Sequence, residues 1–194
     1  MIYHLQGKLV EVTPAFAVVD CGGVGYMVNI TLQTYTHISG ASAVKLYTLP
    51  IYKEDSQTLF GFHSKTEREM FSLLISVSGV GGNTARVILS SLSAEELQDC
   101  IASENTALLK SVKGIGAKTA QRIIVDLKDK VSGIGLNEAS GSTTGDSNLV
   151  QEATSALEVL GYQSRQTHKI LYQIKKENPS IGLEELIKTA LKRL

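Results

Sequence analysis

The sequence predicts a multi-domain α+β protein, in which a small β-rich domain precedes two helical domains. Three observations predict this class. Apolar residues alternate with polar ones up to residue 63, they recur at helical spacing from residue 64 onwards, and a segment rich in Gly, Ser and Thr interrupts the helical part. We therefore expect domains at residues 1–63, 64–131 and 149–194, joined by a flexible linker at 132–148.

The first domain is predicted to contain five short strands with turns at residues 22–23 and 53–56. The strands are indicated by Val10 with Val12, by residues 16–19, by Tyr26 with Val28 and Ile30, by residues 44–52 and by residues 58–62. Five strands with one long connection at residues 32–42 fit a small closed barrel. An oligonucleotide-binding (OB) barrel is one such form, and an SH3-like barrel is nearly as compatible.

The period changes to that of a helix at Ser64. Residues 64–67 form a capping box, and apolar residues follow at helical spacing (Met70, Leu73, Leu74 and Val77). Residues 93–96 repeat the capping signature and begin another helix. The whole of residues 64–130 is therefore predicted to be helical.

An internal repeat lies within this helical domain. Residues 73–92 align without gaps on residues 108–127, and half of the aligned positions are identical. The shared positions include the pairs Gly79/Gly114, Gly81/Gly116, Thr84/Thr119 and Ala85/Ala120. Each copy has the order helix, G-[VI]-G, helix, which is the helix-hairpin-helix signature. Two copies in tandem are much more specific than one.

The G-[VI]-G units have three interpretations. A mononucleotide loop is disfavoured, because no strand precedes either copy and no P-loop or dinucleotide pattern is present. The glycines could instead allow close packing of helices. We favour a third interpretation, in which the hairpin and the following helix N-terminus present backbone N–H groups to phosphates of a nucleic acid. The candidate residues are Gly79, Gly81, Asn83, Thr84 and Arg86 in the first copy, and Gly114, Gly116, Lys118, Thr119 and Arg122 in the second.

The local charge supports phosphate binding by the second copy. The chain has no net charge, yet residues 108–130 contain six basic residues against two acidic ones. In the first copy Asn83 stands where the second has Lys118, and Arg86 is the only nearby cation. Contacts of this kind read the backbone rather than the bases, so we expect no sequence specificity.

The composition excludes several other classes. The segment MIYHLQGK lacks the apolar core and cleavage pattern of a signal peptide, so none is expected, and no apolar run approaches the length of about 18 residues that a membrane span needs. The two cysteines are isolated and the four histidines are scattered, which predicts a cytoplasmic protein without a metal site. We expect no catalytic residue and no cofactor.

Three short helices are predicted beyond the linker. Their apolar faces are Val150, Ala153, Leu157 and Leu160, then Thr167, Ile170, Leu171 and Ile174, then Leu183, Leu186, Ile187, Ala190, Leu191 and Leu194. Residues 133–194 carry seven basic and seven acidic residues, which leaves no basic patch for DNA. A separate tail domain on a flexible tether predicts a module that docks a partner protein.

The full length of the chain resembles the RuvA family of bacterial proteins. The resemblance rests on the order of the parts, on the stretches MIYHLQGKLVEV, CGGVGY and KEDSQTLFGF, and on both G-[VI]-G units. It implies a homotetramer, or two tetramers forming an octamer, that holds a four-way Holliday junction open and square during recombination and repair. It also implies recruitment of a hexameric RuvB-type ATPase, which drives branch migration, through residues 149–194. The chain itself contains no ATPase motif.

The resemblance also assigns roles to particular residues. The acidic pin of the family falls on Glu54 and Asp55, whose carboxylates would repel phosphates and separate strands at the junction centre. Family members commonly carry lysine at the position of Asn83, which predicts weaker binding by the first hairpin here. Gly82, beside Gly81, is expected to loosen that hairpin further.

Two alternatives remain at this point. One is a helix-hairpin-helix repair enzyme, either a glycosylase or a nuclease. A nuclease usually needs a carboxylate cluster for its metal, but Asp126 and Asp129 are flanked by Lys128 and Lys130 with no further carboxylates nearby. The other alternative is a structural adaptor whose helical repeats bind only protein.

Overall fold

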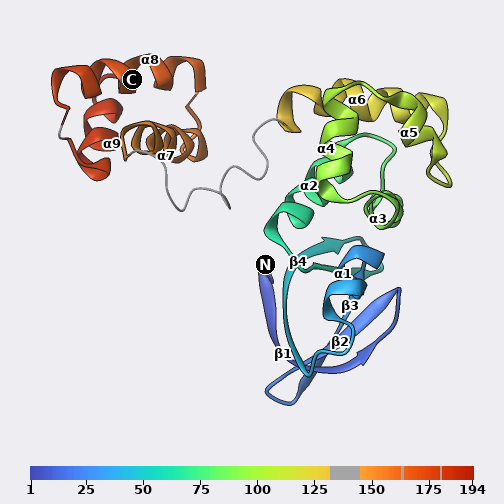
Figure 1. The fold of residues 1–194 in the computed structure, drawn as a ribbon. Coiled ribbons are helices and arrows are strands. Elements are labelled where there is room, and N and C mark those ends of the chain that lie inside the picture. Colours follow the sequence, from blue (N-terminus) through green and yellow to red (C-terminus); the bar gives the residue numbers. More distant parts are fainter. Residues whose placement is uncertain (132–144, 163, 180) are drawn as a thin grey trace. The chain divides into compact units, whose positions relative to one another are not determined.

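The computed structural model describes residues 1–131, 145–162, 164–179 and 181–194. The chain divides into two compact units, Met1–Asn137 and Glu138–Leu194, each with its own helices (Figure 1). Most of the predicted linker, residues 132–144, lies outside the described residues.

The N-terminal part is a closed five-stranded barrel with the strand order β1-β2-β3-β5-β4. Its strands are β1 (His4–Val12), β2 (Phe16–Cys21), β3 (Val24–Ile30), β4 (Ala43–Tyr52) and β5 (Gln57–Phe62). All neighbouring strands are antiparallel except β3 and β5, whose short parallel pairing joins Asn29 to Phe60 and Ile30 to Gly61. Inward-facing side chains such as Val19, Val28 and Leu46 fill the interior. This arrangement confirms the predicted OB-like barrel.

One element of the barrel was not predicted. Helix α1 (Leu32–Ile38) occupies the long connection between β3 and β4, and the side chain of Thr31 caps it by accepting from the N–H of Thr34. Only Thr34 and Ile38 of this helix are buried. A helix of two turns with one apolar buried residue leaves no periodic signal, so the connection appeared irregular.

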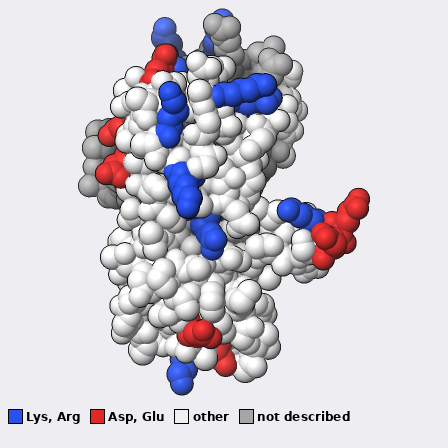
Figure 2. Space-filling view, turned by 90° about the vertical axis from the view of Figure 1, so that its right-hand side faces the viewer, with Lys and Arg blue, Asp and Glu red and all other residues white. Residues whose placement is uncertain are grey.

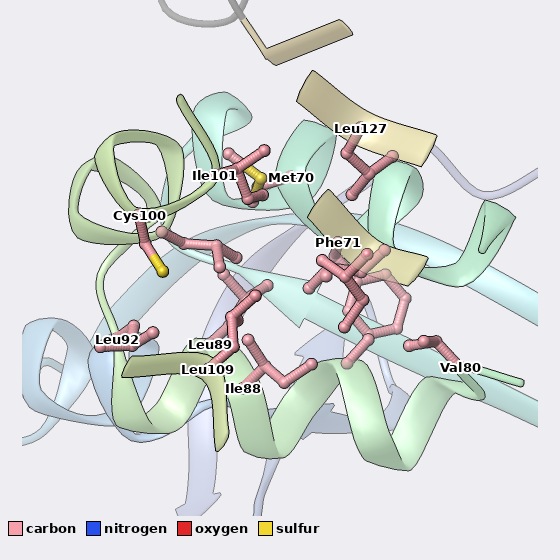
Figure 3. Close-up of a cluster of buried hydrophobic side chains, with 14 of the residues drawn as sticks. Met70, Phe71, Val80, Ile88, Leu89, Leu92, Cys100, Ile101, Leu109 and Leu127 are labelled. Atoms are coloured by element: carbon pink, nitrogen blue, oxygen red, sulfur yellow. The ribbon is translucent and has the colours of Figure 1, made fainter. Parts of the chain in front are cut away.

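The helical domain contains α2 (Lys65–Ser76), α3 (Gly82–Ser91), α4 (Ala94–Ala102), α5 (Thr106–Ser111) and α6 (Ala117–Val131). These helices share one core with Phe60 and Phe62 of β5, and Figure 3 shows its centre around Phe71. Val80 and Ile115, the middle residues of the two G-[VI]-G units, are buried in this core. Both hairpins are therefore anchored to the same apolar cluster.

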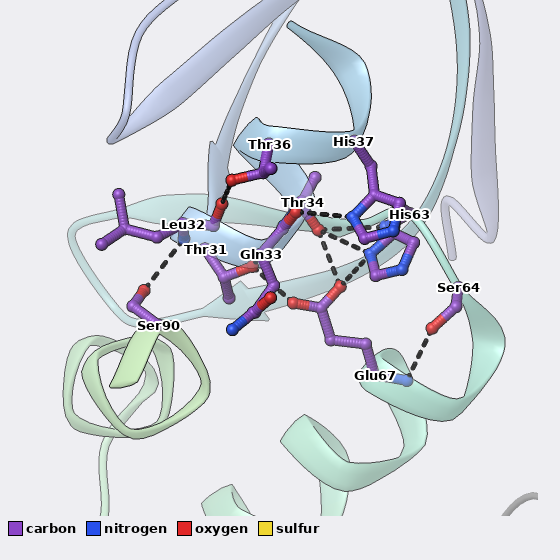
Figure 4. A network of polar contacts seen from close by, with 10 residues as sticks. All are labelled: Thr31, Leu32, Gln33, Thr34, Thr36, His37, His63, Ser64, Glu67 and Ser90. Carbon is purple, nitrogen blue, oxygen red and sulfur yellow. Dashed lines mark hydrogen bonds and ion pairs between the residues drawn. The ribbon is translucent and has the colours of Figure 1, made fainter. Parts of the chain in front are cut away.

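The two predicted capping boxes differ. Ser93 and Glu96 form the complete box, in which each side chain accepts from the other residue's backbone N–H. Ser64 accepts from the N–H of Glu67, but the Glu67 carboxylate points toward Thr31 and Thr34 at the start of α1 instead of back to Ser64 (Figure 4). The prediction was thus wrong for half of the first box.

Glu67 owes its position to a buried polar network. Its carboxylate accepts hydrogen bonds from the hydroxyls of Thr31 and Thr34, and His63 Nδ1 lies 2.8 Å from one of its oxygens. The Glu67 side chain is almost fully buried, and a buried carboxylate needs such partners to offset its lost hydration. The network connects α2 to α1 and to the end of β5.

The second unit consists of α7 (Gly145–Val159), α8 (Ser164–Glu177) and α9 (Leu183–Leu191). These helices surround a separate core of Val150, Ala153, Leu157, Leu171, Ile174, Ile181, Leu186 and Ala190. Helix α7 begins at Gly145, four residues before the predicted start of this domain. The predicted three-helix domain is confirmed as a fold.

Three leucines predicted on the inward faces of this unit are exposed instead. Leu160 is 59% exposed, because α7 ends at Val159 and the chain turns at Gly161, which has a φ of +95°. Leu191 and Leu194 are 38% and 37% exposed, since α9 ends at Leu191 and the core extends only to Ala190.

Candidate nucleic-acid interface

The two hairpins have the same backbone geometry. Gly79 and Gly114 have φ values of +92° and +90°, a region that suits glycine because it has no Cβ. The N–H of Val80 donates to the Val77 carbonyl at 3.0 Å, and the equivalent bond from Ile115 to Val112 is 3.1 Å long. The repeat found in the sequence is therefore a repeat in three dimensions.

Each hairpin leads directly into a helix N-terminus. The first helical bonds run from Ala85 to the Gly81 carbonyl and from Ala120 to the Gly116 carbonyl, both at 2.9 Å. Gly81 is the N-cap of α3, and no side chain of the described residues caps that helix. The first N–H groups of an α-helix have no partner within the helix, and the helix dipole makes this end attractive to anions.

Gly81 and Gly116 are not required by the fold itself. A Cβ added at either position would meet nothing within 4 Å, and neither residue has a left-handed φ. This geometry disfavours the interpretation that these glycines allow helices to pack closely. A missing side chain on an exposed turn instead lets a group from outside approach the backbone.

The second repeat adds positive charge next to its hairpin. Lys113 and Lys118 are exposed, and Thr119 on the first turn of α6 is partly exposed. The Arg122 guanidinium is half-exposed and lies 3.8 Å from the Asp126 carboxylate one turn later. On the face shown in Figure 2, a row of basic side chains runs down the molecule, while acidic side chains gather at the end of one projection.

The sequence count of charges overstates this patch in one respect. The Lys128 ammonium pairs with Glu104, a residue on the turn after α4 that the count over residues 108–130 did not include. This hydrogen bond and the lysine charge lower the pKa of Glu104, and the same bond raises the pKa of Lys128. Sequence offered no signal for a pair separated by 24 residues.

The first repeat has fewer free polar groups. Asn83 is exposed and Thr84 is partly exposed, as a phosphate contact requires. Arg86, however, points to the barrel, where its Nη1 donates to the Ala15 carbonyl at 2.8 Å. The sequence did not indicate this contact, because Ala15 lies on a turn 71 residues away.

Gly82 also has a role that differs from the expectation. A Cβ at Gly82 would lie 2.8 Å from Ile51 Cδ1 and from Phe60 Cζ, closer than side chains normally approach. Gly82 thus brings the start of α3 against the β4–β5 hairpin. The missing side chain at Gly82 allows the start of α3 to pack closely against the barrel. It does not loosen the first hairpin, as the sequence had suggested.

The predicted acidic pin lies on the turn between β4 and β5. The N–H of Lys53 donates to the Ser56 carbonyl at 2.8 Å and closes this turn. Glu54 and Asp55 are both exposed at its tip. Ile51 and Phe60, which pack against Gly82, belong to the same hairpin.

Within the described part of the chain, no cluster of three or more His, Cys, Asp or Glu side chains could hold a metal ion. Asp126, considered above for a nuclease, pairs with Arg122 instead. Among the described helices, none combines the length and the apolar character needed to cross a membrane.

Comparison with known proteins identifies the family. Three family models match the chain: the RuvA N-terminal domain over residues 1–61, a SAM-like helix-hairpin-helix tandem over 71–129, and the RuvA C-terminal domain over 148–194. Proteins named Holliday junction branch migration complex subunit RuvA are similar over the full length of both chains. Identity is 52% for the protein of Christiangramia forsetii, 51% for that of Bacteroides thetaiotaomicron and 48% for that of Flavobacterium psychrophilum. The chain therefore belongs to the RuvA family.

Proposed function

We propose that this protein binds four-way Holliday junctions through their phosphate backbone, as the DNA-binding subunit of a branch migration complex. The open glycines Gly81 and Gly116 carry the proposal, because the fold leaves their missing side chains unexplained and an approaching phosphate explains them. The names of the full-length relatives support the identity of the DNA.

The donors are backbone N–H groups of both hairpins, together with Thr84, Thr119 and Lys118. None of these groups reads a base edge when it contacts a phosphate, so binding is independent of sequence. Arg122 contributes when it exchanges Asp126 for a phosphate, since the ion pair is long and half-exposed.

Selectivity for junctions is assigned to the acidic turn and to assembly. In a homotetramer with four-fold symmetry, four copies of Glu54 and Asp55 would meet at the crossover of the junction. Carboxylates repel phosphates there, which keeps the strands apart and disfavours continuous duplex. The exposed position of both side chains at the tip of the β4–β5 turn supports this role.

A competition between a four-way junction and linear duplex of the same sequences tests the function. The wild-type protein should prefer the junction by at least about tenfold, a difference of about 1.4 kcal/mol. The double variant Glu54→Gln/Asp55→Asn should bind linear duplex more tightly and lose part of the preference. Equal affinity of the wild type for the two DNAs would contradict the proposal. Cleavage of the junction when Mg²⁺ is added would instead support the nuclease alternative.

The C-terminal unit is assigned to docking of a hexameric ATPase motor. It has its own core, and Leu160, Tyr162 and Tyr172 are exposed on its surface. Aromatic side chains such as tyrosine are enriched in protein interfaces relative to the rest of the surface.

A chain ending at Asn137, the last residue of the first unit, tests this assignment. It should bind a junction about as tightly as the full chain, yet fail to stimulate ATP turnover by the RuvB-type partner. Branch migration driven by the shortened chain would show that the tail does not dock the motor. Tyr172→Ala in the full chain provides a milder variant with the DNA-binding unit unchanged.

A further inference from the structure

The first hairpin is attached to the barrel at several points around α3. Gly82 packs against Ile51 and Phe60, as described above. One turn beyond Arg86, the Ser90 hydroxyl accepts a hydrogen bond of 3.1 Å from the N–H of Leu32 at the start of α1 (Figure 4). The same hydroxyl donates to the Arg86 carbonyl at 2.8 Å. The side of α3 that carries these residues thus faces the barrel.

Arg86 provides the charged contact of this attachment. Its guanidinium donates to the Ala15 carbonyl at 2.8 Å and lies 3.5 Å from the amide oxygen of Asn29 on β3. The Asn29 amide nitrogen in turn lies 3.4 Å from the Leu59 carbonyl on β5. Both contacts come from the same charged donor, and the bond to Ala15 at 2.8 Å is much shorter than the 3.5 Å contact with Asn29, so the Ala15 bond dominates. Through Asn29 the attachment extends to the strand that leaves the acidic turn.

We propose that Arg86 is a positioning residue that holds the first hairpin in place relative to the acidic turn, and that it acts without contacting a phosphate. This inference rests on the proposed function, since it assigns part of the junction selectivity to the attachment. The first repeat has asparagine where the second has lysine, so its proposed donors are backbone N–H groups and the uncharged Thr84 hydroxyl. Such donors are effective only when they are placed accurately, to within about 0.5 Å.

Equilibrium binding of Arg86→Gln, Arg86→Lys and Asn29→Ala to a junction and to linear duplex tests the proposal. Both Arg86 variants should reduce the ratio of junction to duplex affinity by about fivefold, the size of one lost hydrogen bond. The slope of log K against log salt concentration should stay at the wild-type value, because no phosphate contact is lost. Asn29→Ala should reduce the ratio less. A flatter slope in Arg86→Gln that Arg86→Lys restores would show that Arg86 is a phosphate ligand instead.

A distance measurement provides a readout that does not depend on DNA. Spin labels at Gln57→Cys and Ser78→Cys, two exposed positions, report the separation of the acidic hairpin and the first DNA-binding hairpin. The partly exposed Cys21 is replaced by serine, and excess unlabelled chain keeps one labelled copy in each assembly.

Arg86→Gln should broaden the distribution of distances between the two labels, whereas Lys118→Gln should leave it unchanged. An unchanged distribution in Arg86→Gln would overturn the positioning role. Failure of the wild type to prefer junctions would contradict the proposed function, and the distances would still decide whether Arg86 positions the hairpin.

Discussion

The two hairpins share a backbone but differ in what surrounds them. Each has a left-handed glycine, a buried Val80 or Ile115, and an open glycine before the helix. In the first copy the following helix is attached to the barrel by Arg86 and Ser90. The second copy carries exposed lysines instead. The comparison shows that the left-handed glycine and the buried apolar residue specify the hairpin backbone. The fold does not require the open glycine, and the remaining positions serve either attachment or charge.

This difference predicts unequal contributions to DNA binding. The second hairpin combines backbone N–H groups and Thr119 with the charge of Lys118, whereas the first depends on N–H groups, on Thr84 and on accurate placement. Replacing a donor side chain should therefore weaken DNA binding by the second hairpin more than by the first. Blocking access to the backbone N–H groups should weaken DNA binding by both hairpins.

Lys118→Gln is expected to have the largest effect. A charge-assisted hydrogen bond contributes about 1.5–3 kcal/mol, so junction affinity should fall by about ten- to a hundredfold. The salt slope should decrease by about 0.9 for each copy of Lys118 that contacts a phosphate. Fluorescence anisotropy over a range of salt concentrations measures both quantities.

Asn83→Ala is the matched control at the equivalent position. Junction affinity should change by at most about twofold, and the slope of log K against log salt concentration should stay the same, because no charge is removed. If Asn83→Ala proved as harmful as Lys118→Gln, the two hairpins would contribute equally and the comparison would fail.

Adding a methyl group at the open glycines should have the next largest effect. In Gly81→Ala and Gly116→Ala the added Cβ atom would meet no atom within 4 Å, so the free energy of unfolding should change by at most about 1 kcal/mol. Both should weaken junction binding by about tenfold, because the methyl group separates the phosphate from the N–H groups. Thermal unfolding and anisotropy together distinguish this outcome from simple misfolding. Undiminished binding by both variants would remove the hairpin backbone from the interface.

The predictability of the fold depended on how local each signal was. The strands, the amphipathic helices and the hairpin glycines follow from neighbouring residues, and the structure confirms them. Helix α1 was missed because it buries too few apolar residues to show a period. The direction of Glu67 was missed because Thr31 and Thr34, which compete with the capping box, come from a distant segment.

In the candidate site, too, features that depend on neighbouring residues could be predicted and long-range contacts could not. The exposed Lys118 could be predicted, since its place follows from the repeat. The contact of Arg86 with Ala15 and the close packing of Gly82 could not, because both depend on how α3 meets the barrel. Long-range contacts of this kind leave no pattern within a short stretch of sequence.

Asn83→Lys should make the first hairpin resemble the second. A lysine on the exposed first turn of α3 adds a phosphate contact, so the salt slope should steepen by about 0.9 for each engaged copy. Affinity should rise by up to about tenfold at low salt. The combination of Asn83→Lys with Lys118→Asn exchanges the two side chains and should recover part of the lost affinity. No recovery in the exchanged protein would show that the first hairpin does not reach the DNA.

The smallest effect is expected at Glu104, which pairs with Lys128 in the last turn of α6. Glu104→Gln frees the Lys128 charge and should raise junction affinity by less than about threefold at low salt, with the gain disappearing as salt screens the charge. Because Glu104 has a lowered pKa, the ion pair is complete at neutral pH and is lost as pH falls through that lowered value. The affinity difference between wild type and variant should therefore exist at pH 7 and disappear on acidification.

Glu104→Gly, which suits the φ of +55° at this position, should give the same gain in affinity with a different stability. A difference that persisted at low pH, or that occurred in only one variant, would show that Glu104 acts through the backbone of its turn and not through the charge of Lys128.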